Sequence, residues 1–181
     1  MSLLKSIQDG EGKTVEFKVE LPNSNTLAKT IIAFSNTGGG KLIIGVNDQG
    51  EIIGLEPDVN IFELKDKVAS IIYETCYPTV LPDIYTTTID DQLLLIIEVY
   101  RGNLLPYYLK NKGKNEGVYI RVGATNRKAS HENILELERQ RMNISFDQEA
   151  NREVELDSLD ISSLEGGFVR AGKVLDQPVM K

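Results

Sequence analysis

The stretch AFSNTGGGKLIIGVND, residues 33–48, joins an apolar, helix-like segment to a short β-branched run through three consecutive glycines. A phosphate-binding P-loop has the form Gly-x-x-x-x-Gly-Lys-Ser/Thr and lies after a strand and before a helix. Here Ser35 stands at the first glycine position, Leu42 follows Lys41, and the helix precedes the strand. A phosphate would therefore meet the negative end of the helix dipole. The stretch predicts a helix-to-strand turn and argues against an ATP site.

The three glycines are expected to let the chain leave the helix and enter the strand. Asn36 and Thr37 would end the helix, and Gly38 or Gly39 would adopt the left-handed conformation that is common at helix C-termini. The remaining glycines would allow a tight entry into the strand and the close approach of another backbone.

Working outward from this stretch, the hydrophobic periodicity predicts three helices and seven strands. The helices are expected at 24–36, at 61–73 and from Ser130 onward; the strands are expected at 14–21, 41–47, 51–55, 85–89, 92–100, 107–109 and 118–122. Turns are expected at 48–50 and 90–91. Strands mostly follow strands, and two helices would cover one face. This order predicts an α+β fold with a mixed, mostly antiparallel sheet.

Length and composition predict one domain in a chain of 181 residues that are 41% hydrophobic. The domain is expected at 1–142, because the pattern fades after Met142, and 143–181 is interpreted as a linker or the start of a further C-terminal region. There is no apolar run near 18 residues, so no membrane span is expected. Cys76 is the lone cysteine and lies in an apolar stretch, which predicts a buried thiol and suits a reducing cytoplasm.

The net charge of −7 at pH 7 argues at first against a nucleic-acid partner, but its distribution does not. Residues 131–181 hold 6 basic and 11 acidic residues, whereas residues 101–128 hold seven basic residues and the single acid Glu116. Local charge decides where phosphates dock, so this basic segment is either a phosphate-binding surface or a solvated lysine-rich loop. Its basic residues are Arg101, Lys110, Lys112, Lys114, Arg121, Arg127 and Lys128.

Three separated motifs resemble the Schlafen AlbA_2 domain: EGKTVEFK at 11–18, AFSNTGGGKLIIGVNDQGEIIGL at 33–55 and YIRVGATNRKAS at 119–130. The resemblance extends over residues 8–142. It implies a DNA-binding module of the kind that forms the N-terminal domain of bacterial transcriptional regulators and of proteins related to RecG helicases. The segment after Met142, with SFDQEA, is similar to the lead-in to the larger C-terminal part of such regulators, so a truncated chain is expected.

The resemblance also implies an alternative, because some animal Schlafens cut transfer and ribosomal RNA with three acidic residues of this domain. The matching residues here are Glu11, Glu16 and Asp48, and such carboxylates would hold Mg²⁺ or Mn²⁺. On one strand Glu11 and Glu16 would point to opposite faces about 16 Å apart, so Glu11 must return by a loop. The strands of Glu16 and Asp48 should be neighbours. Because Schlafen nucleases carry two copies of the fold, cleavage here would require a homodimer.

The function that the residues favour is a nucleic-acid-binding module of a regulator, with DNA or RNA as the partner. Tyr107, Tyr108 and Tyr119 lie in the basic segment and would either stack on bases or belong to the core. A protein-interaction domain is the third hypothesis, because the chain is acidic overall. The expected contacts are Asn126 to the nucleic-acid backbone or sugar, and to phosphates Lys41, Arg101, Lys110, Lys112, Lys114, Arg121, Arg127 and Lys128.

Overall fold

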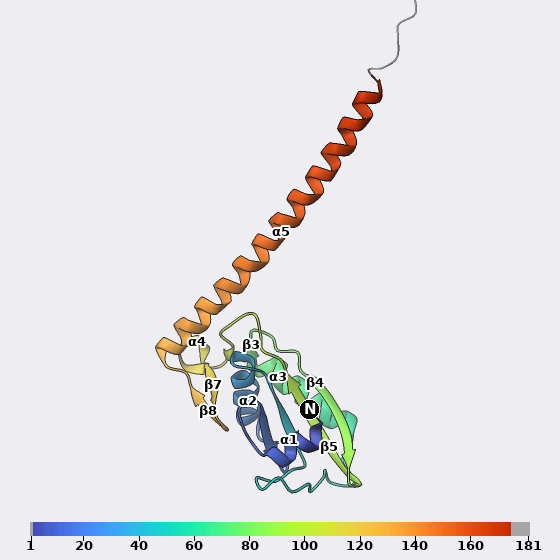
Figure 1. Ribbon diagram of the computed structural model, residues 1–181. Helices are drawn as coiled ribbons and strands as arrows, with labels where there is room; N and C mark the ends of the chain where they lie inside the picture. Colours follow the sequence, from blue (N-terminus) through green and yellow to red (C-terminus); the bar gives the residue numbers. More distant parts are fainter. Residues whose placement is uncertain (1, 175–181) are drawn as a thin grey trace, which may run out of the picture. The chain divides into compact units, whose positions relative to one another are not determined.

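The structure is a computed structural model that describes the backbone of residues 2–174 and the side chains of residues 2–152 and of Val154 (Figure 1). The chain divides into two units, Met1–Arg141 and Met142–Lys181. The described elements, in chain order, are α1 (Leu3–Asp9), β1 (Val15–Lys18), α2 (Ser24–Asn36), β2 (Gly40–Ile44), α3 (Ile61–Thr75), β3 (Cys76–Tyr77), β4 (Asp83–Ile89), β5 (Gln92–Val99), β6 (Tyr108–Leu109), α4 (Gly113–Gly117), β7 (Tyr119–Val122), β8 (Thr125–Lys128) and α5 (His131–Val174).

A four-stranded sheet in the order β1-β2-β5-β4 organises the first unit. The β1–β2 pair is parallel, and the β2–β5 and β4–β5 pairs are antiparallel. The β4–β5 hairpin turns at Asp90 and Asp91, which both have positive φ. The predicted α+β fold with a mixed, mostly antiparallel sheet is therefore confirmed. Two small ribbons, β3–β6 and β7–β8, complete the strand structure that the described residues contain.

Strand alternation divides the apolar residues between the two faces of the sheet. Leu42 and Leu95 point to the larger cluster, which contains the buried faces of α2 and α3. Their neighbours Ile43 and Leu94 point to the smaller cluster on the opposite face, together with Ile7 of α1. Two helices thus cover one face, as predicted. The α1 helix on the other face was not predicted, since LLKSIQD has only a short apolar pattern.

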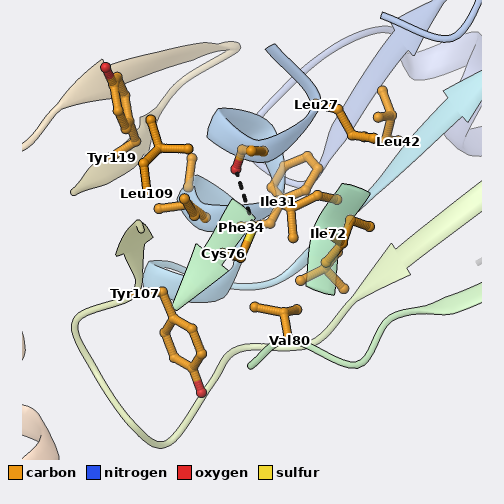
Figure 2. Packing of buried hydrophobic residues seen from close by; sticks show 14 of the residues in the cluster. Leu27, Ile31, Phe34, Leu42, Ile72, Cys76, Val80, Tyr107, Leu109 and Tyr119 are labelled. Carbon is orange, nitrogen blue, oxygen red and sulfur yellow. Dashed lines mark hydrogen bonds between the residues drawn. The ribbon is translucent and has the colours of Figure 1, made fainter. Parts of the chain in front are cut away.

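Cys76 lies within the larger cluster, as Figure 2 shows, between side chains that include Ile31, Phe34, Ile72 and Val80. Its side chain is fully buried, and its Sγ lies 4.0 Å from the carbonyl oxygen of Ala28. The predicted buried thiol is confirmed.

The glycine turn behaves as a helix exit. Helix α2 ends at Asn36, and Gly39 has a φ of 74°, whereas Gly38 does not need positive φ. A Cβ on Gly39 would lie 2.7 Å from the carbonyl oxygen of Val99, and a Cβ on Gly40 would lie 2.6 Å from the Phe34 ring. The glycines therefore serve the left-handed turn and the close approach that the sequence predicts.

Several local features differ from the strand ranges that the sequence predicts. Residues 51–55 form a single bridge, Val46 to Ile52, because β5 occupies the edge of β2 that this segment would need. Strand β6 pairs with β3, and the 118–122 segment touches it through one bridge, Tyr108 to Val118. Strand β7 instead pairs with β8, whose polar sequence TNRK carries no apolar alternation. Helix α2 is capped by Asn23, whose side chain accepts from the Thr26 N–H.

Helix α5 begins after Ser130, whose hydroxyl accepts a hydrogen bond from the N–H of Asn133 at 3.2 Å. In the first unit its Ile134 and Leu137 are buried. In the second unit the described backbone is helical from Met142 to Val174. The apolar pattern of the sequence fades in this region, so no helix was predicted there. Among the described residues, no helix is both long and apolar enough to cross a membrane.

Candidate nucleic-acid interface

A buried arginine, Arg121, joins the β7–β8 hairpin to the first strand of the sheet. Its side chain is 3% exposed and lies 5.2 Å from the centre of the Phe34 ring. The guanidinium donates to the carbonyl oxygen of Gly12 through Nε (3.1 Å) and Nη2 (2.9 Å), and to that of Val15 through Nη2 (3.1 Å). Its Nη1 donates to the side-chain oxygen of Asn126 at 2.9 Å. Arg121 thereby fixes the loop before β1.

The same guanidinium neutralises Glu16, which strand alternation turns toward α2 and away from solvent. Glu16 is 8% exposed, and its Oε2 lies 2.7 Å from Nη1 of Arg121. That oxygen has no well-aligned hydrogen bond, so the compensation is the ion pair itself. The other oxygen, Oε1, accepts from Lys18 Nζ at 2.7 Å. The charge of the buried carboxylate is thus compensated by two cationic neighbours.

The structure argues against two of the expected phosphate or sugar contacts, those of Arg121 and Asn126. Arg121 is buried, and Asn126 uses its amide to bond the Thr30 hydroxyl at 2.9 Å while its oxygen accepts from Arg121. The sequence motif YIRVGATNRK could not distinguish them from their exposed neighbours, because β8 and the alternation of β7 were needed to decide which side chains point inward. Reversing the charge of Arg121 would test folding rather than binding.

The remaining six basic residues of the 101–128 segment are exposed. Lys114 forms an ion pair with Glu138 at 2.5 Å, and Lys128 pairs with Glu116. The hydrogen bond from Lys128, followed by its charge, lowers the pKa of the Glu116 carboxyl. Exposed ion pairs of this kind are weak and exchange with other anions. The six residues are Arg101, Lys110, Lys112, Lys114, Arg127 and Lys128.

Arg101 and Lys41 lie at the glycine turn, beside two hollows of about 340 and 250 Å³ that share Gly38 and Arg101. Arg101 donates to the side chain of Gln140, and Lys41 pairs with Glu98 at 3.4 Å. Lys13, which the sequence did not single out, lines the larger hollow. It comes from the loop before β1 and is exposed, so only the folded loop brings it to this surface.

The three acidic residues of the nuclease hypothesis occupy different settings. Strands β1 and β2 are neighbours, as that hypothesis requires, and the loop before β1 returns so that Glu11 Oε1 accepts from the Phe17 N–H at 2.8 Å. Asp48, however, is exposed in the turn after β2. No group of three His, Cys, Asp or Glu side chains able to hold a metal ion occurs in the part of the chain that the structure describes. The catalytic role of Glu11, Glu16 and Asp48 stays a prediction.

The tyrosines of the basic segment divide between core and surface. Tyr107 and Tyr119 are 5% and 9% exposed and belong to the larger cluster. Their backbones are tied to α2 by Asn36, whose side-chain nitrogen donates to both carbonyl oxygens at 2.9 Å and whose oxygen accepts from the Tyr107 N–H. Tyr108 is half-buried and packs against Tyr77. Of the two roles that the sequence left open for Tyr107 and Tyr119, the structure therefore supports the core role and not stacking on bases.

Comparison with known proteins gives the chain a family and a fold. The profile of the family described as Schlafen, AlbA_2 matches residues 11–130. The crystal structure of the DIP2311 protein from Corynebacterium diphtheriae has a TM-score of 0.51 and 23% identity over 70% of this chain, which spans 24% of the DIP2311 chain. The N-terminal domain of a protein related to the ATP-dependent DNA helicase RecG from Nitrosomonas europaea has a TM-score of 0.48 and 22% identity over 71% of this chain and 91% of its own. No functionally curated protein matches.

Proposed function

The chain belongs to the Schlafen AlbA_2 family, and from this premise we propose that it is a nucleic-acid-binding module whose contact surface consists of the exposed basic residues of the 101–128 segment. One observation carries the proposal. After the buried Arg121 is excluded, six exposed cations remain in a segment whose single acid is Glu116. Phosphate groups along a nucleic-acid backbone would replace the weak ion pairs of Lys114 and Lys128.

The segment is suited to phosphates because it concentrates positive charge within a chain whose total charge is −7. Backbone binding releases counterions, so it depends on local cations and falls steeply with salt. With up to six phosphate contacts, affinity for duplex DNA is expected to drop about a thousandfold between 50 and 200 mM salt. A surface that binds through apolar contacts would show no such slope.

We further propose that the module is the N-terminal domain of a transcriptional regulator in the cytoplasm, as the resemblance implies. We also propose that it acts as a homodimer. The second unit supports a homodimer, since its helix exposes Met142, Phe146 and Val154 at 71%, 72% and 69%. Apolar side chains four and eight residues apart lie on one broad side of a helix and favour pairing with a second helix.

The proposal is tested by fluorescence anisotropy with labelled single-stranded and duplex DNA and RNA at several salt concentrations. The double variant Lys112→Glu/Arg127→Glu changes two exposed charges and should lose binding while keeping its thermal midpoint. Lys67→Glu, an exposed lysine on α3, is the matched control and should bind as wild type does. Equal affinity in the double variant would remove this surface, and no binding of any probe by wild type would leave the protein-interaction hypothesis.

The same samples test the nuclease alternative when Mn²⁺ is added and the RNA is run on a gel. Asp48→Asn is the informative variant, because Asp48 is exposed and its substitution leaves the buried Glu16–Arg121 pair intact. Cleavage by wild type that is lost in Asp48→Asn would establish the nuclease. Binding without cleavage is the outcome that the binding-module proposal expects.

A further inference from the structure

An aromatic patch lies where α3 ends against the β3–β6 ribbon. We call it the tyrosine platform and define it as Tyr73, Tyr77, Tyr108 and Lys110. Tyr77 lies opposite Tyr108 in the antiparallel register, and their ring centroids are 5.3 Å apart with the planes inclined at 47°. Tyr77 is 50% exposed and Tyr73 is 62% exposed. Both rings therefore present aromatic surface to solvent, and Tyr77 is held in place by its partner.

A lysine lies within the platform. Lys110 Nζ is 5.3 Å from the centre of the Tyr73 ring and donates to the Tyr73 carbonyl oxygen at 2.6 Å. The Lys110 N–H donates to the Thr75 carbonyl oxygen at 2.9 Å, which extends the β3–β6 ladder by one pair. Lys110 is the first residue after β6 and lies in the turn that the Lys112 N–H closes by donating to the Leu109 carbonyl oxygen at 3.1 Å. Lys112 follows and is exposed.

We propose that the tyrosine platform stacks unpaired bases, so that the module prefers single-stranded nucleic acid; this inference rests on the proposed function. Base stacking on aromatic rings combined with nearby cations for the backbone is the physical pattern of single-strand binding. Bases of an intact duplex are stacked on one another and do not reach such rings. Lys110 and Lys112 would contact the phosphates that flank a base stacked on Tyr77.

One acidic residue, Glu74, lies beside the platform in the described structure. Glu74 follows Tyr73 and lines a hollow of about 230 Å³ with Lys110 and Asn111. A contrasting tyrosine, Tyr100, is 61% exposed, but its hydroxyl donates to Asp83 at 3.0 Å, and this bond and the charge of Glu98 raise its pKa. Tyr100 offers the same ring beside the carboxylates of Asp83 and Glu98, which would repel a phosphate backbone. It is therefore the matched control for the platform.

The first test uses the absence of tryptophan from the sequence. Tyr77→Trp places a single tryptophan at the platform, and Tyr100→Trp places one at the control site. Titration with oligothymidylate should quench the first emission and leave the second unchanged, because a base that stacks on an indole quenches it. A duplex of the same length, at the same concentration, should quench neither. Equal quenching by both probes, or none by the single strand, would overturn the platform.

The second test measures affinity by anisotropy. Tyr73→Ala and Tyr77→Ala should each weaken binding of the single strand about fivefold or more and leave duplex binding unchanged, which is the lower end of the effect of removing one stacked base. Tyr77→Phe keeps the ring and should bind as wild type does, and so should Tyr100→Ala. Thermal melting identifies variants that fail to fold. If Tyr77→Ala is one of them, Tyr73→Ala and the tryptophan titration decide.

The failures of the two proposals are distinguishable. If wild type binds single strand and duplex equally, if Tyr73→Ala and Tyr77→Ala change nothing, and if Lys112→Glu/Arg127→Glu abolishes binding, the platform is wrong and the binding module stands. If wild type binds no probe, both are wrong. A preference for single strand that depends on Tyr77 but not on Tyr100 supports both.

Discussion

At the scale of single residues, the decisive feature is the buried pair of Arg121 and Glu16. We predict that Arg121→Ala lowers the free energy of unfolding by about 3–5 kcal/mol, because it leaves a carboxylate that is 8% exposed without its main cation. Arg121→Lys should restore little, since one ammonium cannot reach the Gly12 and Val15 carbonyls and the Asn126 side chain together. Urea unfolding followed by circular dichroism measures the loss.

The control for this prediction is Arg127→Ala, six residues along the hairpin and exposed. Exposed substitutions away from special features usually change stability by less than about 0.5 kcal/mol. If Arg121→Ala is as mild as Arg127→Ala, the pair contributes nothing to the fold and Glu16 is free for another role, including that of a metal ligand.

Cys76 provides a prediction with a defined pH range. Burial raises the pKa of its thiol from 9.0 to about 11, against smaller opposing effects of the Thr75 hydroxyl and the Lys110 charge. Between these values the unfolded chain has released a proton that the native protein still holds, so stability falls as pH rises from 9 to 11 and is unaffected below 9. Urea unfolding from pH 8 to 10.5 should show this slope, and Cys76→Ala should reduce it. A slope unchanged by the substitution would contradict a buried, protonated thiol.

At the scale of elements, the two adjacent glycines Gly38 and Gly39 in the turn between α2 and β2 have different roles. We predict that Gly39→Ala destabilises the domain by at least about 1–2 kcal/mol, because φ is 74° and the new Cβ would lie 2.7 Å from the Val99 carbonyl oxygen. Gly38→Ala should be near neutral, since a Cβ there meets nothing within 4 Å and φ is not positive. Thermal melts compare the two variants directly, and equal effects would refute this account of the turn.

The elements also show what the sequence could and could not predict. The runs 41–47 and 92–100 predicted β2 and β5 because buried strands need continuous apolar residues, and 24–36 predicted α2 because its apolar positions follow the helical period. Strand β8 was missed because TNRK is stabilised by its hairpin with β7 and by the Asn126–Thr30 bond, which are tertiary contacts. The burial of Arg121 could not be predicted for the same reason, since it depends on Gly12 and Glu16, over a hundred residues away.

The sequence could predict which segment is basic, but not which of its side chains are exposed or which other residues lie beside them. Counting charges located the basic segment, and six of its seven cations are exposed. The tyrosine platform was invisible because Tyr73 and Tyr77 lie more than thirty residues before Tyr108 and Lys110, and only the β3–β6 pairing brings them together.

At the scale of the whole molecule, the chain combines a folded unit with its own apolar clusters and a second unit that is helical as far as it is described. Residues 131–181 carry most of the net negative charge of −7, with 11 acidic and 6 basic residues. The binding proposal therefore assigns the phosphate contacts to the first unit alone. Removing the second unit removes negative charge and none of the proposed phosphate contacts, so each contact surface should keep its own affinity.

This division leads to a prediction about the fragment 1–141. It should unfold cooperatively with a thermal midpoint close to that of the full chain, because the buried residues of both clusters lie before Arg141. It should still bind nucleic acid, because the proposed contact residues all lie in the first unit. The fragment lacks the exposed Met142, Phe146 and Val154, which are the proposed contacts of the dimer. Most of the stability of a helix comes from packing its apolar side chains, so these residues favour a second helix as partner. Light scattering should therefore find a dimer for the full chain and a monomer for the fragment. Met142→Glu/Phe146→Glu in the full chain, which retains the length of the helix, should give the monomer too. A fragment that remains dimeric would assign the subunit contact to the first unit, and a full chain that is monomeric at all concentrations would remove the homodimer from the proposed function.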